Sequence, residues 1–105
     1  MGPRRRRVIW TERAVASVDD AVTFVAADSP TAAERLLIRI LDSAESLSEL
    51  TERGRIVPEI DDPQVRELII PPYRLVYQYD ESQVQLLALL HSAQEFILRR
   101  PDRNG

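Results

Sequence analysis

The sequence contains no cysteine and no lysine, and each absence excludes a kind of chemistry. Without cysteine the chain can form neither disulfides nor thiolate metal sites, which fits a reducing cytoplasm. Without lysine it has no lysine to serve as a catalytic base or a Schiff-base partner. All 14 basic residues are therefore arginines, and only one histidine, His91, is present.

Long apolar runs are also missing. The longest, LLALL at residues 86–90, is far too short to cross a bilayer, and no apolar region of signal-peptide length follows the arginine-rich start. We therefore expect a cytoplasmic protein with no membrane partner. A chain of 105 residues is long enough for one small domain with a single core.

Positive charge is scarce outside the first few residues. The net charge is −3, and without Arg4–Arg7 ten arginines remain against 17 acidic residues. Nucleic-acid binding needs a positive surface that neutralises phosphates, so we expect no specific binding to DNA by the chain alone. Residues 1–7 are expected to form a basic, solvated arm. A nucleic-acid clamp, or a remnant of tag removal at Gly2 and Pro3, are the alternatives.

Two helices are predicted in the first half. Thr11 is suited to cap a helix over 12–27, and Ser29 with Pro30 begins a second helix that we expect to end near Glu52, before Gly54. Both carry an apolar stripe at helical spacing. The stripe residues are Val15, Val18, Val22 and Val25 in the first helix, and Ala33, Leu36, Leu37, Ile40, Leu41, Ala44 and Leu47 in the second.

The second half has the composition of strands separated by turns. Runs at 55–60, 65–70, 73–79 and 83–91 follow a first strand at 6–10. Pro58 places the run at 55–60 at an edge, and the apolar run at 83–91 predicts a central strand covered on both faces. A short helix is expected at 92–98 and a flexible tail at 99–105.

These elements predict an α+β fold in the order β-α-α-β-β-β-β. An N-terminal antiparallel helix hairpin would pack on a mostly antiparallel sheet of four to five strands, within a single domain at 8–98.

The strand PPYRLVYQY at 71–79 should place Tyr73, Leu75 and Tyr77 on one face and Arg74 on the other. One hypothesis is a nuclease site, in which Arg66 and Arg74 hold a phosphate while His91 or Tyr73 transfers a proton. The alternative is structural. Arginines on a sheet, Arg55 among them, would pair with Glu59 and Glu67, and Tyr77 would pack in the core. The acidic composition favours the structural role.

No cofactor or metal site is expected. The acidic group at Glu59, Asp61 and Asp62 lacks the spacing and the glycine of a calcium loop, and there is no HExxH sequence. A solvated acidic turn is the favoured interpretation.

Several segments together resemble the RelE/ParE superfamily of bacterial type II toxins. These are the SPTAAERLL start of the second helix, GRIVPE at 54–59, REL at 66–68, YRLVY at 73–77 and the apolar strand that ends in His91. The likeness covers about residues 8–96. It implies a cytoplasmic toxin that is neutralised by a cognate antitoxin whose C-terminal segment wraps around it.

The resemblance leaves the target open between two branches. RelE-like toxins cut messenger RNA on the ribosome with basic side chains, whereas ParE-like toxins poison DNA gyrase without an established hydrolytic site. The acidic, lysine-free composition favours the ParE-like branch. An inactive toxin fold that only binds the antitoxin is the third alternative. On the favoured interpretation the partner-binding residues are Arg55, Arg66, Arg74, Tyr77, His91 and Phe96.

Overall fold

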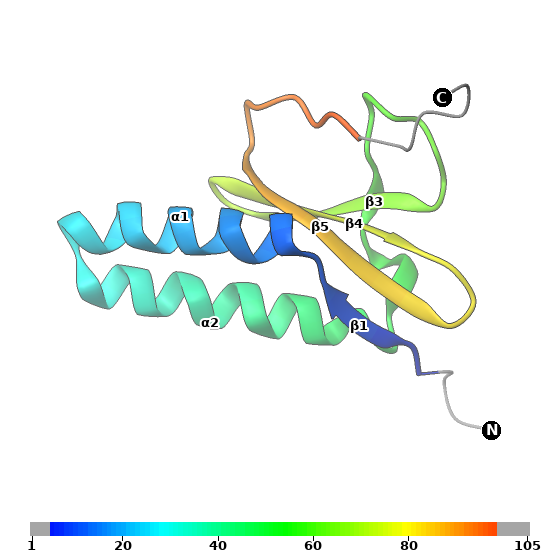
Figure 1. Ribbon diagram of the computed structural model, residues 1–105, viewed down its shortest axis with the longest axis horizontal. Coiled ribbons are helices and arrows are strands. Elements are labelled where there is room, and N and C mark those ends of the chain that lie inside the picture. Colours follow the sequence, from blue (N-terminus) through cyan, green and yellow to red (C-terminus); the bar gives the residue numbers. More distant parts are fainter. Residues whose placement is uncertain (1–4, 99–105) are drawn as a thin grey trace.

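The computed structural model describes residues 5–98 and contains two helices and five strands (Figure 1). In chain order these are β1 (Arg7–Trp10), α1 (Glu12–Asp28), α2 (Pro30–Ser46), a 3-10 turn (Thr51–Arg53), β2 (Arg55–Ile56), β3 (Val65–Ile70), β4 (Tyr73–Tyr79) and β5 (Gln83–His91). The strands form one sheet in the order β1-β5-β4-β3-β2. β1 runs parallel to β5 and every other pair is antiparallel, so the predicted fold class and element order are confirmed.

Local capping explains where the helices begin. The Thr11 hydroxyl accepts a hydrogen bond from the Ala14 N–H at 3.1 Å, and the Ser29 hydroxyl accepts one from the Ala32 N–H at 3.1 Å. Each cap satisfies an amide that the first helical turn leaves unpaired. Pro30 occupies the first turn of α2, as expected.

The predicted end of the second helix near Glu52 is wrong, because α2 ends at Ser46. After Ser46 the chain turns, and the Thr51 hydroxyl donates to the Leu47 carbonyl at 2.7 Å. The separate 3-10 turn then brings Gly54 against the hydroxyl of Tyr77 in β4. Burial of Leu47 and this contact decide where the helix stops, and neither depends on local sequence alone.

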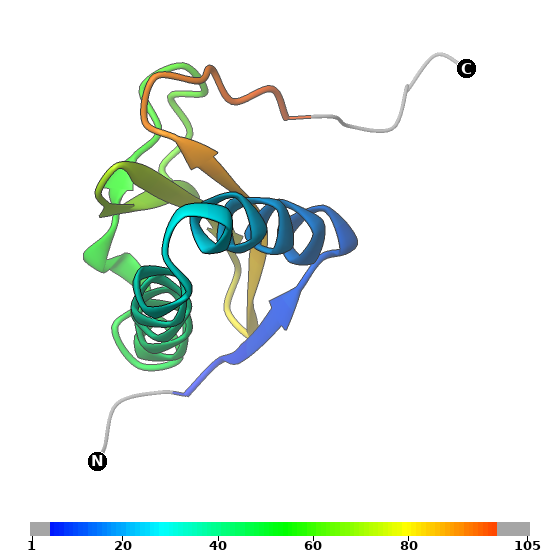
Figure 2. The same ribbon diagram turned by 90° about the vertical axis from the view of Figure 1, so that its left-hand side faces the viewer.

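The sheet carries a core on each face. The helix hairpin covers one face, with Ile40, Leu75 and Leu86 among the buried residues (Figures 1 and 2). The other face, here called the back face, is covered by the chain that follows β2 and by residues 92–98. Phe96 from this last segment packs with Val76 of the sheet in the second core.

The short helix predicted at 92–98 is not formed. Side chains bind the backbone groups that a helix would need for its own hydrogen bonds. The Phe96 N–H donates to Oε2 of Glu59 at 2.7 Å, and the Gln94 carbonyl accepts from the guanidinium of Arg74. The segment therefore lies as an irregular strap over the back face.

The central strand is β4, so the prediction of a central final strand is wrong in position. β5 is nevertheless an inner strand between β1 and β4, and it is buried on both faces. A bulge beside Val76 and Tyr77 leaves Leu87 without a partner in the ladder, since Val76 pairs with Ala88 and Tyr77 with Leu86. Because consecutive residues of β5 are apolar, the strand presents apolar side chains to both cores, and the bulge places Leu87 and Ala88 together on the back face.

The two edge strands of the sheet, β1 and β2, test the predicted edge strand and the predicted N-terminal arm. β2 has only two residues and ends before Pro58, which confirms an edge strand. At the opposite edge Arg6, predicted to lie in a solvated arm, is docked on the domain: its Nε donates to the Asp80 carbonyl at 2.8 Å, and its guanidinium lies 5.7 Å from the Tyr79 ring centroid. Arg5 pairs with Glu49 at 3.0 Å and Arg7 begins β1, so these residues of the predicted arm also belong to the folded domain. Residues 1–4 of the predicted arm and the predicted tail at 99–105 lie outside the described residues. Within 5–98, neither helix has the length and apolar character needed to cross a membrane.

Candidate functional site

The predicted site residues on β3 and β4 lie on opposite faces of the sheet. Tyr73, Leu75 and Tyr77 face the helices, and Arg74 faces the back, as the strand alternation predicts. Arg66 lies directly across from Tyr77 and so shares the helix-facing side. The structure therefore does not bring Arg66 and Arg74 together around a common ligand.

Arg74 is the centre of an ion-pair cluster on the back face. Its Nη1 lies 2.6 Å from Oε1 of Glu67, and its Nη2 lies 2.5 Å from Oε2 of Glu59. The second oxygen of Glu67 pairs with Nε of Arg55 at 2.5 Å. The side chains of Arg74 and Glu67 are 6% and 0% exposed, whereas that of Arg55 is 63% exposed. The predicted pairing of these arginines with Glu59 and Glu67 is therefore observed.

These contacts favour the ionised forms of Glu59 and Arg74. The hydrogen bond from Arg74 lowers the pKa of Glu59 from 4.5 to about 2, and the same hydrogen bond raises the pKa of Arg74. A third partner, the Gln94 carbonyl, accepts from Nη2. Among the described residues Nε of Arg74 has no partner, but it is buried. Arg74 could hold a phosphate only if these internal contacts were broken.

Arg66 and Tyr77 are also engaged in structural contacts. Arg66 donates to three main-chain carbonyls, those of Glu52, Gly54 and Pro63. The Tyr77 hydroxyl donates to the Thr51 carbonyl at 2.6 Å and accepts from the Gly54 N–H at 3.0 Å. Burial raises the pKa of Tyr77, so its phenol stays protonated at neutral pH.

Phe96, another predicted partner-binding residue, is buried in the back-face core. The guanidinium of Arg13 lies 5.0 Å from its ring centroid and covers it. Phe96 is therefore part of the packing beneath the strap, and its side chain is not available to a partner in this structure.

Tyr73 and His91 lie together at the surface. They are directly opposite in the β4–β5 ladder, with ring centroids 6.0 Å apart in an edge-to-face arrangement. They border a groove of about 480 Å³ that α1 closes on the other side, with Phe24 and Asp20 at its rim. Phe24 is 77% exposed. We call this the Tyr73–His91 groove.

Sequence reasoning missed Phe24. The available signal was its position two residues after Val22, which takes it off the apolar stripe of α1 and leaves a large aromatic side chain with no core to enter. Exposed aromatic side chains of this kind mark binding surfaces more often than catalytic sites.

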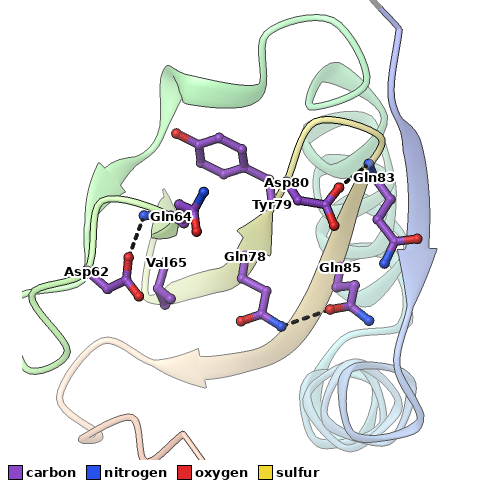
Figure 3. Close-up of a pocket in the computed structure, with 8 residues that line it drawn as sticks. All are labelled: Asp62, Gln64, Val65, Gln78, Tyr79, Asp80, Gln83 and Gln85. Atoms are coloured by element: carbon purple, nitrogen blue, oxygen red, sulfur yellow. Dashed lines mark hydrogen bonds between the residues drawn. The ribbon is translucent and has the colours of Figure 1, made fainter.

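A second pocket, of about 230 Å³, lies at the other end of the sheet (Figure 3). Four of its eight lining residues are glutamines, and Gln78 donates to Gln85 across the strands at 2.8 Å. Asp80 accepts from the backbone N–H groups of Ser82 and Gln83, which lowers its pKa. None of the predicted site residues lines this pocket. Within 5–98, no three His, Asp or Glu side chains gather closely enough to hold a metal ion.

Comparison with known proteins places this architecture in a family. The family model described as the ParE toxin of type II toxin-antitoxin system, parDE, matches residues 8–96. A curated relative, Toxin RelE2 of Caulobacter vibrioides, is 34% identical over 88 residues, which cover 83% of this chain and 96% of that protein. A solved structure described as the chromosomal ParDE TA system from P. aeruginosa superimposes with a TM-score of 0.67 at 21% identity, covering 84% of this chain and 97% of that one. The chain thus belongs to the ParE toxin family of type II toxin–antitoxin systems, within the RelE/ParE superfamily.

Proposed function

We propose that this toxin inhibits DNA gyrase by binding it, without covalent chemistry of its own, and that a cognate antitoxin neutralises it in the cytoplasm. The observation that carries the proposal is that the guanidinium of Arg74 is already paired with two carboxylates. Arg74, one of the two arginines predicted to hold a phosphate, is enclosed between the carboxylates of Glu59 and Glu67 and faces away from His91. A site that cleaves RNA needs such a cation free to meet the phosphate in the transition state.

The Tyr73–His91 groove is the surface that would contact the target. It combines the exposed ring of Phe24 with Tyr73 and His91 above an apolar floor of Leu89 and Leu90. Aromatic side chains at the centre of a contact contribute most of the energy in protein–protein interfaces. Of the six residues predicted to bind a partner, His91 and Arg55 are exposed, while the others take part in internal contacts.

The expectation that an antitoxin binds this chain rests on its family. The matching family model and the P. aeruginosa structure both describe toxins of paired parDE systems. A cognate antitoxin is therefore the expected partner of this chain, and binding to it should not depend on which target the toxin attacks.

A ribosome-dependent RNase is the second candidate function. Two observations favour it: the 34% identity to a protein named Toxin RelE2, and the exposed position of His91 beside Tyr73, where a proton could be transferred. In that case His91 or Tyr73 would transfer the proton, but the predicted phosphate ligands Arg66 and Arg74 lie on opposite faces of the sheet and could not hold one phosphate together. A toxin fold that only binds the antitoxin is the third.

Induction in growing bacteria without the antitoxin separates the three. Gyrase inhibition should produce DNA breaks, filamentation and an SOS response, and purified gyrase should accumulate cleaved plasmid when the toxin is added. Messenger RNA cleaved at ribosomes, with intact DNA, would overturn the proposal in favour of the RNase. Normal growth with a correctly folded protein would leave the inactive module.

A further inference from the structure

The strap forms part of the wall of the Tyr73–His91 groove. Figure 1 shows it as the orange segment beyond β5, and its residue Gln94 lines the groove together with His91. The two residues are joined by a turn, in which the Gln94 N–H donates to the His91 carbonyl at 2.9 Å and Oε1 of Gln94 accepts from the His91 N–H at 2.8 Å. The position of His91 therefore depends on where Gln94 lies.

The same turn acts on the imidazole ring of His91. The Ala93 N–H donates to Nδ1 of the ring at 3.4 Å. A ring nitrogen that accepts a hydrogen bond carries no proton, so the neutral ring keeps its proton on Nε2. The ring also lies edge-to-face against Tyr73, with the centroids 6.0 Å apart. The turn thus sets both the orientation of the ring and the nitrogen that can donate to a partner.

Packing alone does not hold this turn. Residues 92–95 are all exposed, and Phe96 is the first residue of the strap whose side chain is buried. Beyond it, Nη1 of Arg13 donates to the Ile97 carbonyl at 3.0 Å, which fixes the far end of the strap. At the near end the Ser92 N–H donates to the Pro72 carbonyl at 2.8 Å. The stretch between these two ends needs a fastening of its own.

Arg74 and Glu59 supply that fastening from the back face. The Gln94 carbonyl accepts from Nη2 of Arg74, and Oε2 of Glu59 accepts from the Phe96 N–H at 2.7 Å. The Glu59 carboxylate also binds the guanidinium of Arg74, so one ion pair holds the strap at two points. Hydrogen bonds to charged groups are stronger than those between neutral groups. Among the described residues that line the groove, neither Arg74 nor Glu59 is present.

We propose that Arg74 and Glu59 are positioning residues for the groove. By holding the strap they fix Gln94, and through Gln94 they set the orientation and the tautomer of His91. The inference rests on the proposed role of the Tyr73–His91 groove in contacting the target. An ion pair on the back face would thus control a surface that it does not itself form.

His91 provides a direct readout because it is the only histidine in the chain, so its ring gives a single set of NMR signals. Glu59→Ala removes both the partner of Arg74 and the acceptor of the Phe96 N–H. We expect it to shift the ring protons of His91, because the ring moves relative to Tyr73. The nitrogen signals of the neutral ring should show a mixture of the two tautomers.

Two further variants separate positioning from a general loss of charge. Glu59→Gln keeps an oxygen that can accept a hydrogen bond and should restore most of the parent spectrum. Glu95→Ala removes an exposed carboxylate from the same strap and should leave the spectrum unchanged. Arg74→Ala is unsuitable, because it also leaves the buried carboxylate of Glu67 without its buried partner. Circular dichroism establishes that each variant is folded before its spectrum is recorded.

The functional measurement is the toxin concentration that half-inhibits supercoiling by purified gyrase. Glu59→Ala should raise this concentration about tenfold, the effect of losing one well-placed contact in an interface. Glu59→Gln should raise it less, and Glu95→Ala should not change it.

An unchanged His91 spectrum in Glu59→Ala would overturn the inference. A shifted spectrum with undiminished inhibition of gyrase would overturn it as well, because the position of His91 would then not matter to the target. A parent protein that does not inhibit gyrase would instead overturn the proposed function. The NMR comparison uses no gyrase, so it would still decide whether Glu59 positions His91.

Discussion

The guanidinium of Arg74 and the carboxylate of Glu67 meet at 2.6 Å in the interior of the sheet, and both side chains are almost fully buried. Glu67 also pairs with Arg55, whose side chain is largely exposed. One carboxylate thus holds a buried and an exposed arginine, which allows the two kinds of ion pair to be compared within one protein.

Arg74→Ala should lower the free energy of unfolding by about 3–5 kcal/mol, because it leaves the buried carboxylate of Glu67 without its buried partner. Arg55→Ala removes the exposed partner of the same carboxylate and should cost about 1 kcal/mol or less. Urea unfolding of both variants measures the difference. Equal costs would contradict the assignment of Arg74 as the structural partner.

Stability should depend on pH through Glu59. Its pKa is lowered to about 2 by Arg74, so the ionised form is favoured by folding. Because Glu59 is an exposed residue, solvent screening reduces the resulting stabilisation to about 1 kcal/mol; it is present above about pH 4.5 and is lost as the pH falls toward 2. Glu59→Gln should therefore be less stable at neutral pH and flatten the decline between pH 4.5 and 2. Glu45→Gln, on the exposed side of α2, provides the control and should keep the slope of the parent protein.

Gly54→Ala should destabilise the protein by about 1–3 kcal/mol. A Cβ at this position would lie 2.6 Å from the Tyr77 hydroxyl and 2.8 Å from the Glu67 carbonyl oxygen. Tyr77→Phe removes the nearer clash but loses two hydrogen bonds, at a cost of about 1–3 kcal/mol. The double variant should therefore cost less than the two single changes added together, which thermal unfolding of all three can determine. Strict additivity would mean that the two groups do not meet.

Phe24→Ser should abolish growth inhibition while changing the free energy of unfolding by less than about 0.5 kcal/mol, since the ring is mostly exposed and contributes little packing. Ile97→Ser, at another exposed apolar position outside the groove, is the matched control and should remain toxic. The comparison combines a growth assay with urea unfolding. A toxic Phe24→Ser variant would remove the Tyr73–His91 groove from the target interface.

The parts of the fold that were predictable from sequence depend on neighbouring residues. Thr11 and Ser29 cap the amides a few positions further on, so the helix starts could be identified locally. The end of α2 and the irregular strap depend instead on contacts with Tyr77 and Arg74, which are distant in the chain. The bulge at Leu87 likewise has no local signature, because it is defined by the pairing of β5 with Val76 and Tyr77 of β4.

The part of the site that could be predicted also depends on neighbouring residues within one strand and on simple charge pairing. Strand alternation was enough to separate Arg74 from Tyr73 and Tyr77, and opposite charges were enough to suggest Glu59 and Glu67 as partners. Alternation within one strand says nothing about how two strands are aligned. The placement of Arg66 opposite Tyr77, which separates it from Arg74, therefore required the observed register.

The parallel pairing of β1 with β5 joins the first strand of the chain to the last. During synthesis, Arg7–Trp10 leaves the ribosome well before Gln83–His91 has been made, so β1 has no partner in the sheet until β5 has emerged. The strap over the back face is made later still. The sheet is therefore completed only after β5 has emerged, and a binding partner has that interval in which to meet a chain whose β1 is still unpaired.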